Sequence, residues 1–208
     1  MQPKFKKGYY PNLLTWKEFV MLINIRPLMT CDRVVVPNYK KDHKWNNGAW
    51  SLDKNCIPPL LVKEIIQNNI SYLTDMSRCS RNVNDLAKKL EEEYNGSADA
   101  HIYTCLNPSL IHPFGIHYDN NHNIIVQCEG ETNFKVWDII KDEDQPRTNM
   151  SITDIPLLYV DMKSGDVIWI PKYYPHLATS HTPRMSVSFP FKSRLKDEPI
   201  QNREWIQL

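Results

Sequence analysis

Two widely separated motifs constrain this chain more than any other feature: His117-Tyr118-Asp119, and a single His176 that follows a strand-like segment. In an extended strand, residues two apart point to the same face, so the imidazole of His117 and the carboxylate of Asp119 can reach one ion together. His176 would complete a set of three ligands. The alternative is that these histidines are hydrogen-bonded core or surface residues without a metal.

The segments around both motifs have the patterns of β-strands. A mostly apolar run, Asn123–Gly130, follows the first motif and ends in a glycine that is typical of a turn. Gly165 and Asp166 predict a second turn, which leads into the apolar strand Val167–Ile170 that ends at Pro171. We therefore expect both halves of the candidate site to lie at strand ends or beside turns.

Two histidines and one carboxylate form a ligand set with a specific chemistry. When they occupy one side of a metal, the opposite positions stay open, and non-haem Fe(II) oxygenases use those positions for a co-substrate and dioxygen. The candidate set in this chain is His117, Asp119 and His176. If the three side chains converge, the sequence predicts a metal site of this kind.

Four pieces of the stretch Ala100–Phe191 form a recognisable order and spacing: His101-Ile102-Tyr103, Phe114-Gly115-Ile116-His117-Tyr118-Asp119, Gln127-Cys128-Glu129-Gly130, and the segment from Gly165-Asp166 to His176. In this order and spacing the stretch resembles the JmjC-type and cupin-like Fe(II)/2-oxoglutarate-dependent oxygenases, and among them the ribosomal-protein hydroxylases. The resemblance implies a mainly β chain with flanking helices, folded as a double-stranded β-helix or jelly roll. It also implies an oxygenase, in particular a hydroxylase, with His117, Asp119 and His176 as the catalytic iron ligands, and with 2-oxoglutarate and dioxygen as co-substrates.

The chain departs from that family where the co-substrate is usually held. A lysine or arginine commonly stands two residues after the glycine of the Gln-x-x-Gly strand, and this chain has Thr132 there. Lys135 lies three residues further on, so a regular strand would turn it to the opposite face. Arg184 shares a face with Ser186, and a guanidinium binds a carboxylate through two parallel hydrogen bonds. We predict that Arg184 and Ser186 bind 2-oxoglutarate; the alternatives are a Lys135 brought inward by a bulge, or a solvated Arg184. Three smaller contributors to the same cofactor-binding pocket are predicted: Asn123, Thr132 and Tyr103.

The composition predicts an enzyme-sized globular protein in a reducing compartment. At 208 residues the chain can bury a substantial core. A net charge of +1 gives no general attraction to nucleic acid or to an anionic membrane, although modified tRNA is among the substrates of the family that the chain resembles. Five cysteines without a C-x-x-C pair favour reduced thiols in the cytoplasm. No apolar run approaches membrane-spanning length, so we expect a soluble protein.

Hydrophobic periodicity divides the chain into a helical part and a β part of one domain, 1–208. Residues 1–99 are expected to be mostly helical, with a capping box at Thr15, a second helix from Pro58-Pro59 and the clearest helix over Asn82–Tyr94. Residues 100–191 are expected to form the β-helix core with the metal site, and residues 192–208 a C-terminal tail. The helices should pack on the outside of this core.

The patterns leave the substrate, the partners and the oligomeric state open. Members of the family that the chain resembles act on ribosomal proteins, other protein side chains, histone lysines or modified tRNA, and the fold does not distinguish among these substrates. We expect the substrate to enter at the metal-bearing mouth, near Tyr103, Trp45 or Trp50 and the loop Lys141–Thr148. Two other classes stay open: a metal-binding cupin that acts on a small molecule without 2-oxoglutarate, and a non-catalytic module that keeps the fold without iron.

Overall fold

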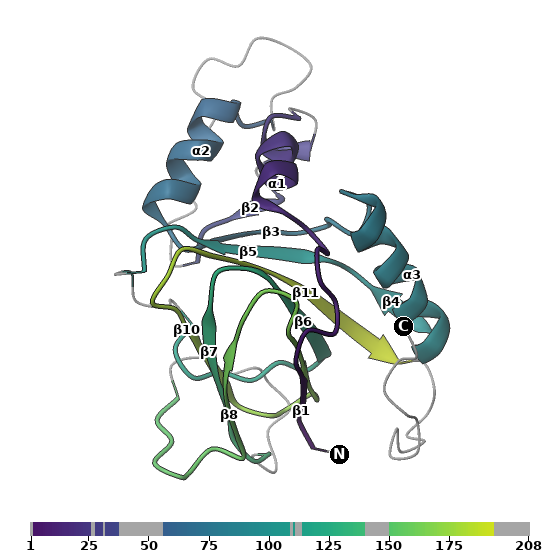
Figure 1. Cartoon of the computed structure of the whole chain (residues 1–208), viewed down its shortest axis with the longest axis vertical. Helices are drawn as coiled ribbons and strands as arrows, with labels where there is room; N and C mark the ends of the chain where they lie inside the picture. Colours follow the sequence, from purple (N-terminus) through teal and green to yellow (C-terminus); the bar gives the residue numbers. More distant parts are fainter. Residues whose placement is uncertain are drawn as a thin grey trace.

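Two antiparallel β-sheets face each other, and the helices lie on the outer side of the larger sheet (Figure 1). This computed structural model describes residues 2–25, 28–30, 32–37, 56–108, 110, 114–139 and 150–193. The larger sheet has the order β1 (Lys4–Lys6), β9 (Val167–Ile170), β6 (His122–Glu129), β11 (Arg184–Ser193), β5 (His101–Cys105), β3 (Ser71–Leu73) and β2 (Val34–Val35), and β4 (Gly96–Ala98) pairs with β11. The smaller sheet has the order β10 (His176–Thr179), β7 (Thr132–Val136) and β8 (Leu158–Met162). This arrangement confirms the predicted mainly β jelly roll with flanking helices.

The three helices of the described chain begin within one residue of the starts that the sequence predicts. They are α1 (Trp16–Ile23), α2 (Pro59–Asn68) and α3 (Arg81–Tyr94). The capping box at the start of α1 is present, because Thr15 Oγ1 accepts from the Glu18 N–H and the Glu18 carboxylate accepts from the Thr15 N–H. α3 ends at Asn95, which adopts a left-handed conformation with φ 46°. None of the three is long and apolar enough to cross a bilayer.

Two separate apolar cores follow from this layering. The first lies between the helices and the outer face of the larger sheet, and one whole side of α3 is buried in it. The second lies between the two sheets, where Phe134 and Val136 of β7 pack with Ile168 and Ile170 of β9. Because the larger sheet is covered on both faces, β6 is buried over almost its whole length.

Strand β11 lies at the centre of the larger sheet and contributes to both of its faces. Its apolar residues from Met185 to Phe191 belong to the core under the helices. The residues between them, Arg184, Ser186 and Ser188, face the space between the sheets. The pairing with β6 shifts by one residue between Met185 and Ser186, so β6 has one extra residue there.

The described part of the first 99 residues also contains four short strands, β1 to β4, which the sequence patterns do not predict. An element of two or three residues is shorter than one repeat of any periodic pattern, so it leaves no signal. β1 pairs with β9 at the edge of the larger sheet. The Gly8 N–H donates to Asp166 Oδ1 at 2.8 Å, which ties the N-terminal segment to the turn before β9.

Candidate metal centre and ligand pocket

Three side chains converge in the space between the two sheets: His117, Asp119 and His176. Their candidate ligand atoms all lie within 4.8 Å of one another, and the two imidazole centroids are 4.3 Å apart. His176 Nε2 lies 3.9 Å from Asp119 Oδ2. Small side-chain rotations would bring three atoms at these distances to bonding range of one ion, which is about 2.0–2.2 Å for nitrogen and oxygen ligands.

The backbone holds the two histidines opposite each other. His117 and His176 form an isolated antiparallel bridge, with N–H···O distances of 3.1 and 2.7 Å. Each imidazole Nδ1 lies at hydrogen-bond distance from the carbonyl two residues before it, 3.1 Å from that of Gly115 and 3.0 Å from that of Tyr174. A ring that donates its Nδ1 proton to a carbonyl keeps its lone pair on Nε2, the atom that then binds a metal.

The electrostatic surroundings of His117 also fit a metal ligand. Burial and the neighbouring His176 lower the pKa of the His117 imidazole to about 4, although the charge of Asp119 acts in the opposite direction. The ring is therefore neutral at pH 7. A neutral imidazole is the form that binds a metal.

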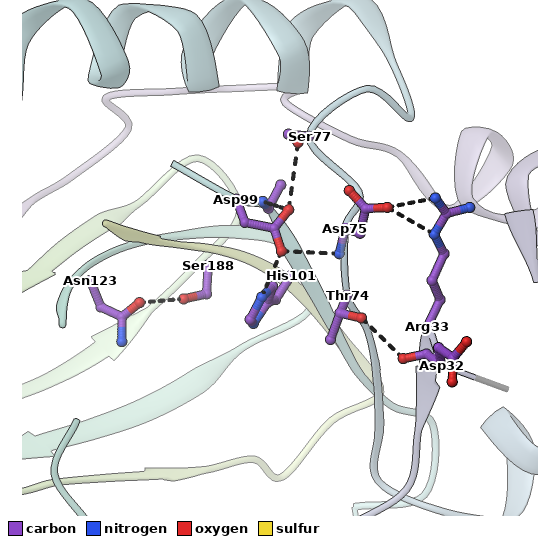
Figure 2. A network of polar contacts seen from close by, with 10 residues as sticks. Asp32, Arg33, Thr74, Asp75, Ser77, Asp99, His101, Asn123 and Ser188 are labelled. Atoms are coloured by element: carbon purple, nitrogen blue, oxygen red, sulfur yellow. Dashed lines mark hydrogen bonds and ion pairs between the residues drawn. The ribbon is translucent and has the colours of Figure 1, made fainter. Parts of the chain in front are cut away.

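A chain of hydrogen bonds orients the carboxylate of Asp119. Asn123 Nδ2 donates to Asp119 Oδ2 at 2.7 Å. Ser188 Oγ donates in turn to Asn123 Oδ1 at 2.9 Å (Figure 2). On the backbone side, the Tyr173 N–H donates to the Asp119 carbonyl at 2.8 Å. The carboxylate is thus fixed both through its side chain and through its main chain.

The three side chains open into a pocket between the sheets. Its volume is about 440 Å³ with the open mouth included. The larger sheet supplies most of its polar wall and the smaller sheet an apolar wall, which is the usual composition of a small-molecule site. The lining residues are Tyr103, Phe114, His117, Asp119, Asn123, Ile125, Phe134, His176, Ala178, Arg184, Ser186 and Ser188.

Arg184 supplies the positive charge of this pocket. The side chain is only 3% exposed, its Nη1 donates to Ser186 Oγ at 2.9 Å, and its buried Nε has no hydrogen-bond partner. Burial lowers the pKa of the guanidinium. Within the described ranges, no carboxylate forms an ion pair with Arg184. A buried cation without a counter-ion is costly, so this position fits a bound anion.

Gly130 lets the chain before Arg184 approach the end of β6 closely. Gly130 has φ +69°, and a Cβ atom there would lie 2.0 Å from the Pro183 carbonyl oxygen and 3.0 Å from Arg184 Cα. Any other residue would push this segment away. The glycine of the Gln-x-x-Gly motif therefore fixes the start of β11 and, with it, the position of Arg184.

Tyr103 also lines the pocket, as the sequence predicts. Its ring stacks on Tyr72 of β3, with centroids 4.9 Å apart. Burial, and then the charge of Asp119, raise the pKa of the Tyr103 phenol. The phenol therefore stays protonated at neutral pH and can donate a hydrogen bond into the pocket.

Thr132 and Lys135 lie outside the pocket lining. Thr132 is buried, and its Oγ1 has no hydrogen-bond partner. Lys135 points to the opposite face of β7, where its Nζ lies 5.4 Å from the ring centroid of Tyr159 on β8. The irregularity in β6 falls before Gly130, so it does not turn Lys135 inward.

Some functional candidates escaped the sequence analysis, and others cannot be placed. Ser188 was missed, although it continues the alternation of Arg184 and Ser186 along one strand, and that signal was available. The apolar wall from Ile125, Phe134 and Ala178 had no signal, because apolar strand residues look alike whether they line a core or a pocket. The expected substrate-entry residues Trp45, Trp50 and Lys141–Thr148 lie outside the described residues, as does the chain after residue 193.

The fold and this constellation define a cupin-fold protein with a two-histidine, one-carboxylate metal site and an arginine beside it. The model of the JmjC domain family matches residues 77–198, which is more than half of the chain. The chain therefore belongs to the JmjC domain family.

Sequence relatives point in the same direction. The chain is 27% identical over 116 residues to the bifunctional lysine-specific demethylase and histidyl-hydroxylase NO66 of Drosophila persimilis, a match that covers 54% of this chain and 16% of that protein. It is 24% identical over 178 residues to the protein of the same name from Brugia malayi, which covers 81% of this chain and 24% of that protein. The chain thus spans a quarter or less of these curated relatives.

Solved structures confirm the fold. The ribosomal oxygenase YcfD of Escherichia coli, in complex with cobalt and 2-oxoglutarate, has a TM-score of 0.62 at 16% identity, over 96% of this chain and 50% of that one. The same protein with cobalt and succinic acid has a TM-score of 0.60 over the same shares. The chain corresponds to about half of YcfD.

Proposed function

We propose that this chain is an Fe(II)- and 2-oxoglutarate-dependent oxygenase that hydroxylates a protein side chain. The observation that carries the proposal is the placement of Arg184, a buried guanidinium, in the same pocket as His117, Asp119 and His176. A metal alone needs no such cation. A co-substrate that binds the metal at one end and carries a carboxylate at the other end needs both.

The metal-binding end of the pocket would hold the reacting groups in position, and its apolar wall would exclude water. His117, Asp119 and His176 would hold the Fe(II) ion, which is the ion that this donor set suits. Bound iron and 2-oxoglutarate would supply the activation of dioxygen that hydroxylation needs. The apolar wall, with Phe134 and Ala178, keeps bulk water away from the reacting atoms.

The opposite end of the pocket would bind the distal carboxylate of 2-oxoglutarate. Arg184 offers its guanidinium, and Ser186, which already accepts from Arg184, offers a hydroxyl beside it. Tyr103 adds a phenol from the neighbouring strand β5, where it pairs with Ser186. In this proposal Arg184 replaces the cation that the family usually carries at the position of Thr132.

A protein substrate is the choice that the relatives support. The NO66 proteins are named histidyl-hydroxylases and lysine-specific demethylases, and YcfD is described as a ribosomal oxygenase. The formal net charge of +1 offers no general attraction to nucleic acid. We extend the proposal to a cytoplasmic location, which the unpaired thiols of Cys56, Cys79, Cys105 and Cys128 support.

Release of succinate tests the proposed function without knowledge of the substrate. The purified full chain, given Fe(II), 2-oxoglutarate and dioxygen, is expected to form succinate slowly, and His176→Ala is expected to form none. Lys135→Ala is the matched control, because Lys135 points away from the pocket. A chain that binds metal but neither binds 2-oxoglutarate nor forms succinate would contradict the proposal and favour a cupin that acts on another small anion.

A further inference from the structure

A series of hydrogen bonds in the pocket leads to the candidate metal ligand Asp119 from two residues that are not metal ligands themselves. It runs from Ser188 of β11 through Asn123 of β6 to Asp119, with donor–acceptor distances of 2.9 and 2.7 Å. Ser188 is 4% exposed and Asn123 is 7% exposed. The Ser188–Asn123 hydrogen bond is buried, so water does not compete with it, and the Asn123–Asp119 bond is part-buried at the pocket wall.

The order of donors along this chain fixes the orientation of the Asn123 amide. The Asp119 carboxylate can only accept, so the amide nitrogen of Asn123 faces it, and the amide oxygen faces the other way and accepts from the Ser188 hydroxyl. If the amide were rotated, its oxygen would face the carboxylate oxygen, and two acceptors would oppose each other. Ser188 therefore holds the Asn123 amide in place through its oxygen, while the amide nitrogen holds the carboxylate.

The surroundings of Ser188 keep its position fixed. Ser188 pairs with His101 of β5 and with Ile125 of β6 in the larger sheet. His101 is in turn held by Asp99, whose carboxylate lies 3.0 Å from the imidazole Nε2 and also accepts from the Ala100 N–H at 2.8 Å (Figure 2). The neighbouring strand is thus anchored beside the serine.

Folding alone does not account for this polar chain. A buried serine and a buried asparagine stabilise a sheet less than apolar residues of similar size, because their hydrogen bonds only replace those with water. Apolar side chains fill the other part of the same inter-sheet space. The chain of hydrogen bonds is therefore explained by what it does to Asp119.

We propose that Ser188 is a positioning residue that acts through Asn123 to hold the Asp119 carboxylate in the orientation that binds the metal. This inference rests on the proposed metal site, and it assigns to Ser188 a role in metal affinity rather than in co-substrate binding. Outer hydrogen-bond partners of metal ligands typically contribute about 10- to 100-fold to metal affinity. We expect Ser188→Ala to weaken metal binding within that range.

A double-mutant cycle on the full chain tests whether Ser188 acts on Asp119 through Asn123. The probe is Co(II), whose visible absorption reports both its affinity and its ligand geometry. Ser188→Ala and Asn123→Ala are each expected to weaken Co(II) binding about 10- to 100-fold and to change the spectrum. Because Ser188 acts through Asn123, the double variant should bind no more weakly than Asn123→Ala alone.

Ser71→Ala is the matched control. Ser71 is a buried serine of the same sheet, its Oγ lies 3.1 Å from Thr104 Oγ1, and it does not line the pocket. Its loss should lower stability without changing Co(II) affinity. Unchanged affinity in Ser188→Ala, or a double variant whose loss is the product of the two single losses, would overturn the positioning role of Ser188 but not the proposed metal site. A wild-type chain that bound no Co(II) would overturn the proposed metal site as well, and a wild type that bound Co(II) but formed no succinate with Fe(II) would contradict only the proposed function.

Discussion

The two faces of strand β11 differ sharply, although their residues alternate along one strand. Toward the helices, Met185, Val187 and Phe189 are completely buried among apolar side chains. Toward the smaller sheet, Arg184 and Ser186 are 3% and 1% exposed, but they are polar and border a pocket. Burial of the first set drives folding, at about 25 cal/mol per Å² of apolar surface. Burial of the second set costs free energy unless each polar group finds a partner.

This difference separates the residues that fold the chain from the residues that give it a function. Changes on the helix-covered face should lower stability and leave the site intact in the molecules that remain folded. Changes on the pocket face should weaken binding of the metal or the co-substrate and leave stability nearly unchanged. The buried guanidinium of Arg184, whose Nε has no hydrogen-bond partner, is the feature of the pocket face that best fits binding of an anion.

The largest effect is expected on the pocket face, from His176→Ala. The loss of one of three ligands should reduce divalent-metal affinity by more than the roughly 10- to 100-fold lost with an outer hydrogen-bond partner. Metal analysis of the purified protein measures this, with His117→Ala as a second test. Equal metal content in wild type and both variants would contradict the proposed site. The urea midpoint of metal-free His176→Ala should stay close to that of the wild type.

The next largest effect is expected on the helix-covered face, from Phe189→Ala. Phe189 is 0% exposed, and truncation of a buried phenylalanine costs about 3–5 kcal/mol because it removes apolar contacts and leaves a cavity. Urea unfolding of the metal-free protein measures the loss. Below the unfolding transition, the variant should still bind metal with the affinity of the wild type. A loss under about 1 kcal/mol would show that this face is not the stabilising core.

A smaller effect is expected from His122, a titratable residue that packs with the apolar side chains of the helix-covered face. The His122 ring stacks on Phe191 at 5.5 Å and on Trp169 at 6.2 Å between centroids, and its Nδ1 accepts from the Lys172 N–H at 3.3 Å. Burial, and then the charge of Lys172, lower the pKa of His122 to about 4 from an ordinary value of 6.5. The folded state therefore favours the neutral ring.

The sign of the pH dependence follows from this lowered pKa. The contribution of His122 to stability is fully present above pH 6.5 and is lost as the pH falls toward 4, because the unfolded chain takes up the proton first. The loss should amount to about 1–3 kcal/mol over this window. Urea unfolding at pH 7.5 and pH 4.5 should show a smaller difference in His122→Phe than in the wild type. The same difference in both proteins would mean that His122 does not titrate as proposed.

Much of the fold could be predicted from the sequence because its larger elements repeat a pattern several times. α3 presents five apolar positions at helical spacing, and its N-cap and C-cap lie within two residues of the predicted ends. β6 and β9 are apolar runs bounded by turn residues. The short strands β2 and β3 could not be predicted, because β2 pairs with β3 and β3 pairs with β5, and in both cases the partner lies far away in the sequence.

The candidate site was predictable where strand parity decides which side chains meet. From strand parity, Arg184 was predicted to share a face with Ser186, and Lys135 to lie on the face opposite Thr132. The structure has both arrangements. Parity did not reveal that Thr132 lies outside the pocket lining, because that depends on where the smaller sheet closes over the larger one. The close approach of Gly130 to Pro183 could not be predicted either, since it joins two segments that are distant in sequence.

The central claim is that the buried guanidinium on the pocket face of β11 binds the distal carboxylate of 2-oxoglutarate. Anaerobic titration of the Fe(II)-loaded chain with 2-oxoglutarate, followed by the weak visible charge-transfer band of the chelate, tests it most directly. Arg184→Ala should lose about 2–4 kcal/mol of binding, or roughly 30- to 1,000-fold in affinity, with metal content unchanged. Lys135→Ala should bind as the wild type does. The reverse pattern, or a wild-type chain that holds iron but shows no band with 2-oxoglutarate, would contradict the account.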